Sequence, residues 1–586
     1  MAKKLLFNNK KTSIPVIAEY VVETGYEYTP AIYEATDKTS GYIENVLTPD
    51  EVIQTDNGDG TTTIIVKDSR KIGKINFDND TTNKSHLLSV NKINTDNMKD
   101  AGRMFFGCSS LTTLDTSNWD MSNVINCSGM FSGCTALTSI DVSNWDMSKN
   151  KNVESMFYEC TSLNSLGNTS RLVTSACISM LNMFISCKAL TTLDVSQWNT
   201  SNTTNMSATF SGCENLTTLD ISNFDVSKVT NLSSMLKNCK KLTTVGDLSN
   251  WNTIKVTDFS NMFRGCKVLT ELNVTNFNTS VATNLAYMFM ECHNITSIGD
   301  LSGWVTTNVT DTNRMFMGCN KLQAVGNLDN WVMDSVTTTI YMFSGCNVLT
   351  TIGDTSNWNL NKCTNTTSMF GDCNALTNLK ANNWGLTINT SMSNMFSSCK
   401  ELQTIEGIEN WTVSNTLTNM DSTFLSCYKI NNLDLKGINT SNVTTFNQLF
   451  RDCKVLTTID VSNWNVEKVA NMNTCFYGCL ALTSINLSSW NPILCTNMTA
   501  MFNGDELLTS LDLSNWNTPV CTNMSNMFNN CRALTSLDIR NFDTTKVTSI
   551  GSMLLSIPSS TVITIDTAKF TKTETECGWD GTFTTI

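Results

Sequence analysis

One motif recurs along most of this chain and limits the folds that the chain can adopt. Between residues 130 and 145 it reads MFSGCTALTSIDVSNW, and closely similar stretches return mostly every 26 residues. A repeat of this length is one small structural unit, which buries its apolar side chains by stacking on its neighbours. The 586 residues are therefore predicted to form one long solenoid rather than several globular domains.

A column of cysteines sets the number of coils. It indicates 17 coils, with Ile557 at the same place in a closing half-coil. Its members are Cys108, Cys134, Cys160, Cys187, Cys213, Cys239, Cys266, Cys292, Cys319, Cys346, Cys373, Cys399, Cys427, Cys453, Cys479 and Cys531, and Asp505 replaces Cys in one coil.

Six coils are longer than the rest, and each of them has a glycine between the strand and the tryptophan position. Glycine tolerates the backbone conformation that an inserted residue demands. We therefore predict bulges at Gly167, Gly246, Gly299, Gly326, Gly353 and Gly407.

Each coil divides into two segments. Leu137, Ile140 and Val142 have the spacing of a short strand with inward side chains, and Trp145 follows where the chain turns. The segment 153–157 has apolar residues at helical spacing and predicts a short α- or 3₁₀-helix. Parallel strands joined by helical crossovers wind right-handed. The predicted fold class is thus an α/β solenoid, a right-handed array of about 17 coils with a parallel β-sheet on one face and short helices on the other.

Composition divides the chain into three parts. Residues 1–86 lack Cys and Trp and are rich in Tyr, which predicts a small β-rich N-terminal domain. Residues 51–66 read as a hairpin around Asn-Gly and Asp-Gly; its Asp56, Asn57 and Asp59 lack calcium-loop spacing, so a plain turn is favoured. The solenoid is predicted over 87–557, and a C-terminal cap over 558–586.

Charge and hydropathy exclude two classes of partner. The net charge is −13 and only 16% of residues are charged, which argues against nucleic acid. No apolar run is long enough to span a bilayer, so membrane insertion is not expected. The apolar run at the N-terminus ends after three residues, too short for a signal peptide, so we expect synthesis in a cytoplasm without general secretion.

The chain has few groups for catalysis. It has two histidines, His86 and His293, far apart in the sequence, and no phosphate loop, zinc-ligand spacing or nucleophile elbow. We therefore expect no catalytic residue, no bound metal and no cofactor.

The cysteine column allows two interpretations. Stacked coils bring equivalent residues within disulfide range. Buried thiols nevertheless behave as small apolar groups, so a reduced, inert ladder in the core is favoured. Cys495 and Cys521, in a second column, are the strongest exception. The methionine column is interpreted as core filling.

A row of aspartates precedes the tryptophan position and is the candidate binding feature. Like charges on neighbouring strands repel, so the row needs an explanation. Either each carboxylate accepts hydrogen bonds from nearby Ser, Thr or backbone groups, or the row binds cations or a basic partner. The candidate exposed acidic row is Asp115, Asp141, Asp194, Asp220, Asp434, Asp460, Asp512 and Asp538.

The repeat resembles the BspA-like leucine-rich repeat family in its 26-residue form. The resemblance covers residues 104–557 and rests on the words Met-Phe-x-Gly-Cys-x-x-Leu-Thr-x-Leu-Asp-x-Ser-Asn-Trp. It implies a leucine-rich-repeat array with surface-exposed binding or adhesion and no enzymatic activity. The chain departs from cellular members in lacking a signal peptide, a lipid anchor and a wall-sorting tail.

These observations lead to a functional hypothesis with one alternative. The hypothesis is a bacteriophage virion structural or decoration protein, made in the host cytoplasm and placed on the virion surface. Its N-terminal domain would dock on other virion proteins, its solenoid would bind a host surface protein or glycan, and it could assemble as a homo-oligomer. The alternative is a BspA-like adhesin on the bacterial cell surface, exported by a non-standard route. An enzyme with a novel site in the N-terminal domain is disfavoured.

Overall fold

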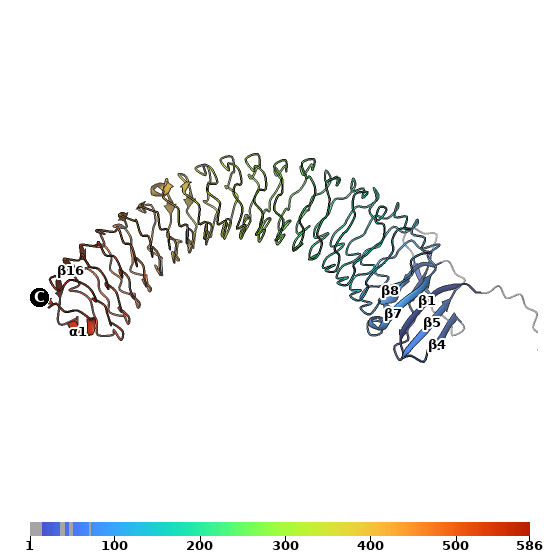
Figure 1. Cartoon of the computed structure of the whole chain (residues 1–586), viewed down its shortest axis with the longest axis horizontal. Coiled ribbons are helices and arrows are strands. Elements are labelled where there is room, and N and C mark those ends of the chain that lie inside the picture. The colour runs from blue at the N-terminus through green and yellow to red at the C-terminus, as the bar shows by residue number, and fades with distance from the viewer. Residues whose placement is uncertain (1–13, 36–41, 46–50, 69–71) are drawn as a thin grey trace, which may run out of the picture. The chain divides into compact units, whose positions relative to one another are not determined.

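The computed structural model describes residues 14–35, 42–45, 51–68 and 72–586 (Figure 1). The chain forms two compact units, Met1–Asp247 and Leu248–Ile586. The first contains the N-terminal domain and the first coils, and the second contains the remaining coils and the C-terminal cap.

The N-terminal domain is β-rich, as predicted, and consists of two sheets. The larger has the strand order β4-β5-β1-β7-β8, and the smaller has the order β3-β2-β6. Two 3₁₀-helices, η2 (Phe77–Asn79) and η3 (Lys84–His86), follow the smaller sheet. The strands are β1 (Val16–Glu23), β2 (Ala31–Ala35), β3 (Tyr42–Asn45), β4 (Val52–Asp56), β5 (Thr61–Lys67), β6 (Ile72–Asn76), β7 (Leu87–Ile93) and β8 (Thr113–Leu114).

The predicted hairpin is confirmed as β4 paired antiparallel with β5. Gly58 and Gly60 in its turn have φ of 75° and 86°, which glycine adopts readily. Asp56 accepts a hydrogen bond from the N–H of Gly58, and Asp59 accepts one from the N–H of Thr61. These carboxylates therefore act within the turn itself.

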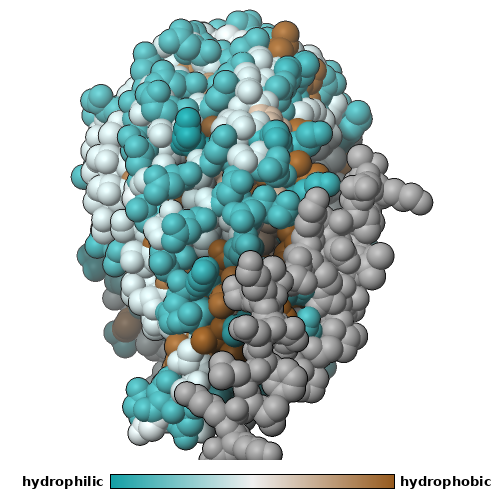
Figure 2. All heavy atoms as spheres, turned by 90° about the vertical axis from the view of Figure 1, so that its right-hand side faces the viewer, coloured by the Kyte–Doolittle hydropathy of each residue, from teal (hydrophilic) through white to brown (hydrophobic). Residues whose placement is uncertain are grey.

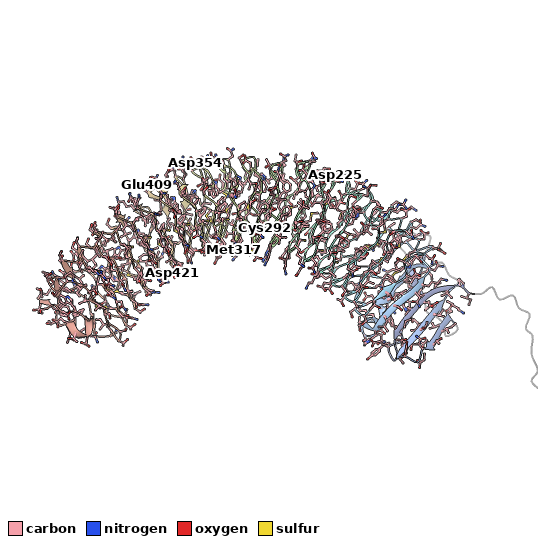
Figure 3. The ribbon with its side chains drawn as sticks, in the orientation of Figure 1. Asp225, Cys292, Met317, Asp354, Glu409 and Asp421 are labelled. Atoms are coloured by element: carbon pink, nitrogen blue, oxygen red, sulfur yellow. The ribbon has the colours of Figure 1, made fainter. Side chains whose placement is uncertain are left out.

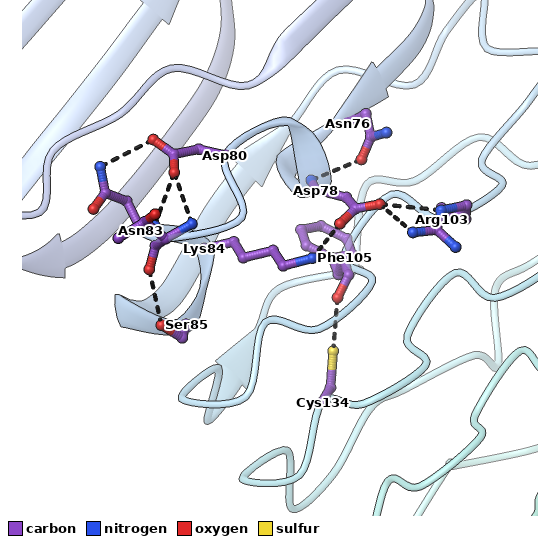
Figure 4. A network of polar contacts seen from close by, with 10 residues as sticks. Asn76, Asp78, Asp80, Asn83, Lys84, Ser85, Arg103, Phe105 and Cys134 are labelled. Carbon is purple, nitrogen blue, oxygen red and sulfur yellow. Dashed lines mark hydrogen bonds and ion pairs between the residues drawn. The ribbon is translucent and has the colours of Figure 1, made fainter.

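The N-terminal domain continues directly into the solenoid. Strand β7 pairs in parallel with β8, which belongs to the first coil. The ring of Phe77 stacks 5.1 Å from that of Phe105, the first phenylalanine of the repeat. Asp78 accepts hydrogen bonds from Lys84 and from Arg103 of the first coil (Figure 4). The domain thus covers the open end of the solenoid, and its boundary with the repeats near residue 86 falls at a strand that both share.

The repeats form a β-solenoid of about 18 turns, close to the predicted 17 coils and a half-coil. Neighbouring coils pair in parallel and in register, often through a single bridge such as Ser139 with Ser165. A second column of bridges, such as Asn126 with Asn152, runs along the other segment. Longer strands in the second unit are β9 (Asn378–Lys380), β10 (Gly385–Leu386), β11 (Thr404–Glu406), β12 (Thr412–Val413), β13 (Asn432–Asp434), β14 (Thr458–Asp460), β15 (Ser510–Asp512) and β16 (Ser536–Asp538).

The prediction of short helices on the second face is wrong. The segment with Met130 and Phe131 consists of consecutive tight turns, in which Gly129 and Gly133 have φ of 60° and 77°. Every coil has a residue with positive φ at each of these two places, which an α-helix cannot contain. Alternate N–H groups bond to the next coil, as Phe131 does to the Met156 carbonyl, rather than along the segment. The apolar spacing that suggested a helix also fits these turns.

The core consists of the predicted columns, each stacked in register. Phenylalanine rings stack along each unit, for example Phe316 on Phe343 at 5.1 Å. Tryptophans form a second stack, and Leu172 occupies the tryptophan position in its coil. Of the cysteines, all 23 are buried and none is in a disulfide.

The six glycines predicted at bulges have the left-handed backbone conformation that glycine tolerates. All six glycines have φ between 70° and 86°. Each also lies against the preceding coil, so that a Cβ on Gly326 would lie 1.9 Å from the Asp300 carboxylate. These positions therefore require glycine for conformation and for space.

The C-terminal segment closes the second unit with strands and one short helix. Strand β17 (Val562–Ile565) pairs in parallel with β16 and with β18 (Thr584–Thr585). Helix α1 (Glu574–Cys577) begins at a capping box between Thr573 and Glu576. Among the described residues, the other helical segments are η4 (Ile408–Asn410) and the two 3₁₀-helices of the N-terminal domain. In that described part, no helix has the length and apolar character needed to cross a membrane.

Candidate interaction surfaces

The eight aspartates of the candidate row lie on the strand side of their coils, exposed or half-buried. One carboxylate oxygen of each accepts a hydrogen bond, between 2.9 and 3.2 Å long, from the N–H two residues further on, which forms an Asx turn. The donors are Ser117, Ser143, Ser196, Ser222, Lys436, Ser462, Ser514 and Arg540. The predicted structural role is therefore observed, and binding of a cation or basic partner stays a prediction.

The same hydrogen bonds set the charge state of the row. Hydrogen bonds from serine lower the pKa of Asp115, Asp141 and Asp512, because they favour the ionised carboxylate. The Ser462 hydroxyl and the Lys436 ammonium lower the pKa of Asp460 to about 2. These four aspartates are therefore ionised at neutral pH.

Two aspartate pairs of the row face each other across neighbouring strands, and each pair has a cation. Asp434 faces Asp460, and the Lys436 ammonium lies 3.7 Å from the first carboxylate and 3.0 Å from the second. Asp512 faces Asp538, which binds the Arg540 guanidinium through both of its oxygens. The chain's own basic groups therefore offset the repulsion at both pairs.

A hollow of about 440 Å³ surrounds Lys436 on this strand side. Its lining is polar apart from Leu433 and Ile459, and the remaining members are Asn432, Asp434, Lys436, Thr458, Asp460, Ser462 and Asn486. A second hollow of about 310 Å³ adjoins Lys436 at Gly437, Ile438, Asn439, Thr440, Asn463 and Asn465. Hydroxyl, amide and charged side chains thus line the same shallow hollow.

A substitution in the tryptophan column coincides with this hollow. Ile438 takes the tryptophan position between Trp411 and Trp464. Phe446 takes a position filled by methionine in other coils, and its ring lies 5.2 Å from that of Trp464. Ile438 is smaller than the tryptophan it replaces, and the Phe446 ring fills part of the core volume that is left, so the coil stays packed.

Two further hollows lie along the same unit. One of about 460 Å³ is lined largely by amides, at Asn361, Asn382, Asn383, Trp384, Gly385, Asn410 and Thr412. The other, of about 340 Å³, includes Asp512, Asp538, Ser510 and Ser536 beside Val562. All are shallow and mainly polar, which suits a ligand rich in hydroxyl groups.

Asparagines directly before the tryptophan position bond to the neighbouring coil. Asn463 and Asn515 each donate 2.8 Å hydrogen bonds to a backbone carbonyl of the preceding coil. These amides hold neighbouring turns together.

The cysteines and histidines form no cluster with acidic residues in the described part of the chain that could hold a metal ion. Most thiols of the main column donate to a phenylalanine carbonyl of the preceding coil, as Cys160 does to Phe131 at 3.1 Å. Burial raises the pKa of Cys495 and Cys521 to about 12 and about 11. His86 contacts Glu23, and His293 contacts the Gly318 carbonyl.

Sequence reasoning missed one group of side chains in the second unit. Arg264, Tyr287, Arg314 and Tyr341 pack together on the tight turns of four consecutive coils, and we call them the arginine–tyrosine cluster. The available signal was the bulk of Tyr287, Arg314 and Tyr341 at a repeat position that holds Gly, Ser, Ala or Asn in most coils; Arg264 stands three residues after that position in its own coil.

Comparison with known proteins places the repeats in one family. Six overlapping stretches match a family described as "Mycoplasma protein of unknown function, DUF285": residues 75–193, 178–298, 241–351, 294–407, 390–492 and 481–564. None of the curated proteins compared with this chain matches it. The matched stretches together run from residue 75 to residue 564, so this chain belongs to the DUF285 family.

Proposed function

We propose that this chain is a non-enzymatic recognition scaffold: a virion structural or decoration protein whose solenoid projects from the particle and binds a host surface protein or glycan. The observation that carries the recognition role is the hollow around Lys436. There, backbone N–H groups hold the Asp434 and Asp460 carboxylates, and the Ser462 hydroxyl and the Lys436 ammonium both bind Asp460. Groups held in place before binding lose little entropy when a ligand arrives.

The finer family placement is part of the proposal. We extend the proposal to the BspA-like repeat family, which the Met-Phe, Cys, Leu and Trp columns resemble. The implied function, surface binding or adhesion, comes from that resemblance.

Attachment to the particle is assigned to the N-terminal domain. Strand β4 is the edge of its larger sheet, and Ile53 on it is 40% exposed. Edge strands offer backbone groups to a partner strand. Among the described residues of this domain, the other large exposed apolar side chains are Ile14 and Tyr26, and hydrophilic groups cover most of the described surface seen from this end (Figure 2).

The alternative function is an adhesin on the bacterial cell surface, exported by a non-standard route. The description of the matched family as a Mycoplasma protein favours it, because that description names a cellular source. Both functions use the solenoid for recognition and differ in what holds the N-terminal domain.

Localisation separates the two functions. Antibodies against the full chain should label purified phage particles, and Ile53→Lys should reduce incorporation into particles while the control Ile254→Lys, 47% exposed in the second unit, should not. Label confined to the envelope of cells free of phage would overturn the virion role and support the adhesin. Failure of the purified chain to bind any host envelope would overturn recognition itself.

A further inference from the structure

The arginine–tyrosine cluster lies away from the aspartate row. Asp354 stands four residues before Trp358, the same place in its coil as the aspartates of the row. Figure 3 places Asp354 and Glu409 at one edge of the second unit. Met317, three residues after Arg314, and Asp421 lie at the opposite edge. The backbone N–H of Tyr287 donates to the Asn313 carbonyl, and that of Arg314 donates to the Ile340 carbonyl. The cluster therefore occupies successive coils with no gap.

Three of its members stand in a costly backbone conformation. Tyr287, Arg314 and Tyr341 have φ of 62°, 53° and 55°. The turn gives every coil a positive φ at this place, and most coils fill it with a small residue or Asn; a bulky side chain there is less common and costs more. Arg103 occupies an equivalent place in the first coil, where its two bonds to Asp78 account for it. The side-chain hydrogen bonds of Arg314 go to Tyr287 and Asn313, and no described carboxylate takes the place that Asp78 has for Arg103.

The side chains of the cluster hold the guanidinium groups beside aromatic rings. The Arg314 guanidinium lies 4.9 Å from the ring centroid of Tyr341 and 5.6 Å from that of Tyr287. It also donates a 3.1 Å hydrogen bond to the Tyr287 hydroxyl. Arg264 lies 5.4 Å from the Tyr287 ring and donates to Asn261. Such contacts orient a guanidinium while leaving donors for a ligand.

The charge of the cluster is not neutralised by the described part of the chain. There, no carboxylate lies within 4.0 Å of Arg264 or Arg314, whereas Arg103, Arg451, Arg532 and Arg540 each contact one. The Nε of Arg264 is also buried without a hydrogen-bond partner. In a chain of net charge −13, two unpaired guanidinium groups form a local site for an anion.

We propose that the arginine–tyrosine cluster binds a short acidic saccharide through a carboxylate on the sugar. The guanidinium forks match a carboxylate, and the Tyr287 and Tyr341 hydroxyls suit sugar hydroxyls. The two arginines are two coils apart, or about 10 Å, which spans a few sugar rings at most. This inference deepens the proposed function and rests on it.

An acidic peptide is the less favoured occupant. Peptides bind along sheets through free backbone groups, in apolar pockets, or through acidic side chains on arginine clusters, and the pentaglutamate probe below tests the last of these. Here the N–H groups of Tyr287, Arg314 and Tyr341 are already bonded to the next coil, and the neighbouring Met290 is buried. The groups left for recognition are charged or hydroxyl donors, which favours a saccharide.

The test is calorimetric binding of trigalacturonic acid to the full chain, with galactotriose and pentaglutamate as comparison probes. Arg314→Gln should weaken trigalacturonate binding about tenfold or more, since a charge-assisted hydrogen bond is lost, and Arg314→Lys should retain part of it. Arg451→Gln is the control: Arg451 also packs on a tyrosine ring, that of Tyr477, and shares the repeat position of Arg264, but it contacts Asp452. It should bind like the native chain.

Each outcome decides the inference. Trigalacturonate binding that is lost in Arg314→Gln and kept in Arg451→Gln supports it. Equal affinity for galactotriose, equal affinity for pentaglutamate, or no trigalacturonate binding would overturn it. If the chain binds host envelopes and Arg314→Gln leaves that binding unchanged, this inference fails while the proposed function stands. Thermal unfolding of each variant shows that the fold is intact.

Discussion

At most cysteines of the main column, one phenylalanine carbonyl accepts two hydrogen bonds. The Phe131 carbonyl accepts from the Cys134 N–H at 3.0 Å and from the Cys160 thiol at 3.1 Å. A thiol that donates a hydrogen bond must be protonated, and burial raises the thiol pKa. The column therefore stabilises the solenoid through reduced thiols, and the cysteines that make this bond serve both packing and backbone hydrogen bonding.

Replacement of a bulge glycine should destabilise the solenoid. Gly326→Ala places a Cβ at φ +80°, 1.9 Å from the Asp300 carboxylate, whereas Gly303 in the preceding coil has open space around its Cα. The left-handed conformation alone costs about 1–2 kcal/mol for a residue with a Cβ. We expect a clearly lower urea midpoint for Gly326→Ala and an almost unchanged midpoint for Gly303→Ala. Equal midpoints would contradict the requirement for glycine.

Asp505 should make stability depend on pH in the opposite sense to the aspartate row. It is fully buried, one oxygen accepts from the Cys479 N–H, and the other has no partner. Burial raises the pKa of Asp505 well above its usual value. Below the pKa of an unfolded aspartate, about 3.9, both states hold the proton; above it the unfolded state ionises first, so the free energy of unfolding falls as pH rises.

Asp505→Asn removes this ionisation and keeps an acceptor for Cys479. We expect the variant to exceed the native chain in stability by about 1–3 kcal/mol at neutral pH, and the difference to shrink as the pH falls towards 4. Denaturant unfolding at several pH values measures it. A difference that does not vary with pH would show that Asp505 does not titrate as described.

The tight-turn segment shows where sequence reasoning at the scale of elements succeeds and fails. Cys127, Met130, Phe131 and Cys134 have the spacing of a helix face, and their burial was predictable from it. The two positive-φ positions between them were not, since Ser155 and Glu159 occupy them in the next coil and carry no glycine signal. The strand, the bulge glycines and the aspartate row followed from periodicity. The right-handed winding stays a prediction.

The C-terminal cap should prevent association of the second unit. Strands β17 and β18 cover the edge of β16, and Trp579 and Phe570 are buried beside them. Removal of residues 558–586 should expose that strand edge and apolar side chains such as Leu537, which promotes association of solenoid ends. Sedimentation velocity should show concentration-dependent oligomers for the truncated chain beyond any formed by the full chain. Identical profiles would contradict the capping role.

Across the whole molecule, stability comes from stacked columns that repeat in both units. The aspartates of the row serve Asx turns, and the described residues hold no cluster of metal ligands. The structure therefore uses its carboxylates internally, and positions outside the motif, such as those of the arginine–tyrosine cluster, are available for a ligand.

Metal ions should not affect the stability of the chain. Because each described carboxylate of the row already accepts a backbone hydrogen bond, thermal unfolding in excess calcium should match unfolding in chelator. Magnesium provides the control for general ionic effects. A rise in melting temperature with calcium alone would support the alternative, cation binding by the row.

The central claim is that this chain recognises a ligand through surface groups that the repeat motif does not use. The most direct measurement is saturation binding of the labelled full chain to host envelopes, made in parallel with the Arg264→Gln/Arg314→Gln double variant and Arg451→Gln. We predict saturable binding that the double variant weakens and Arg451→Gln retains. The absence of saturable binding to any host envelope would contradict the claim.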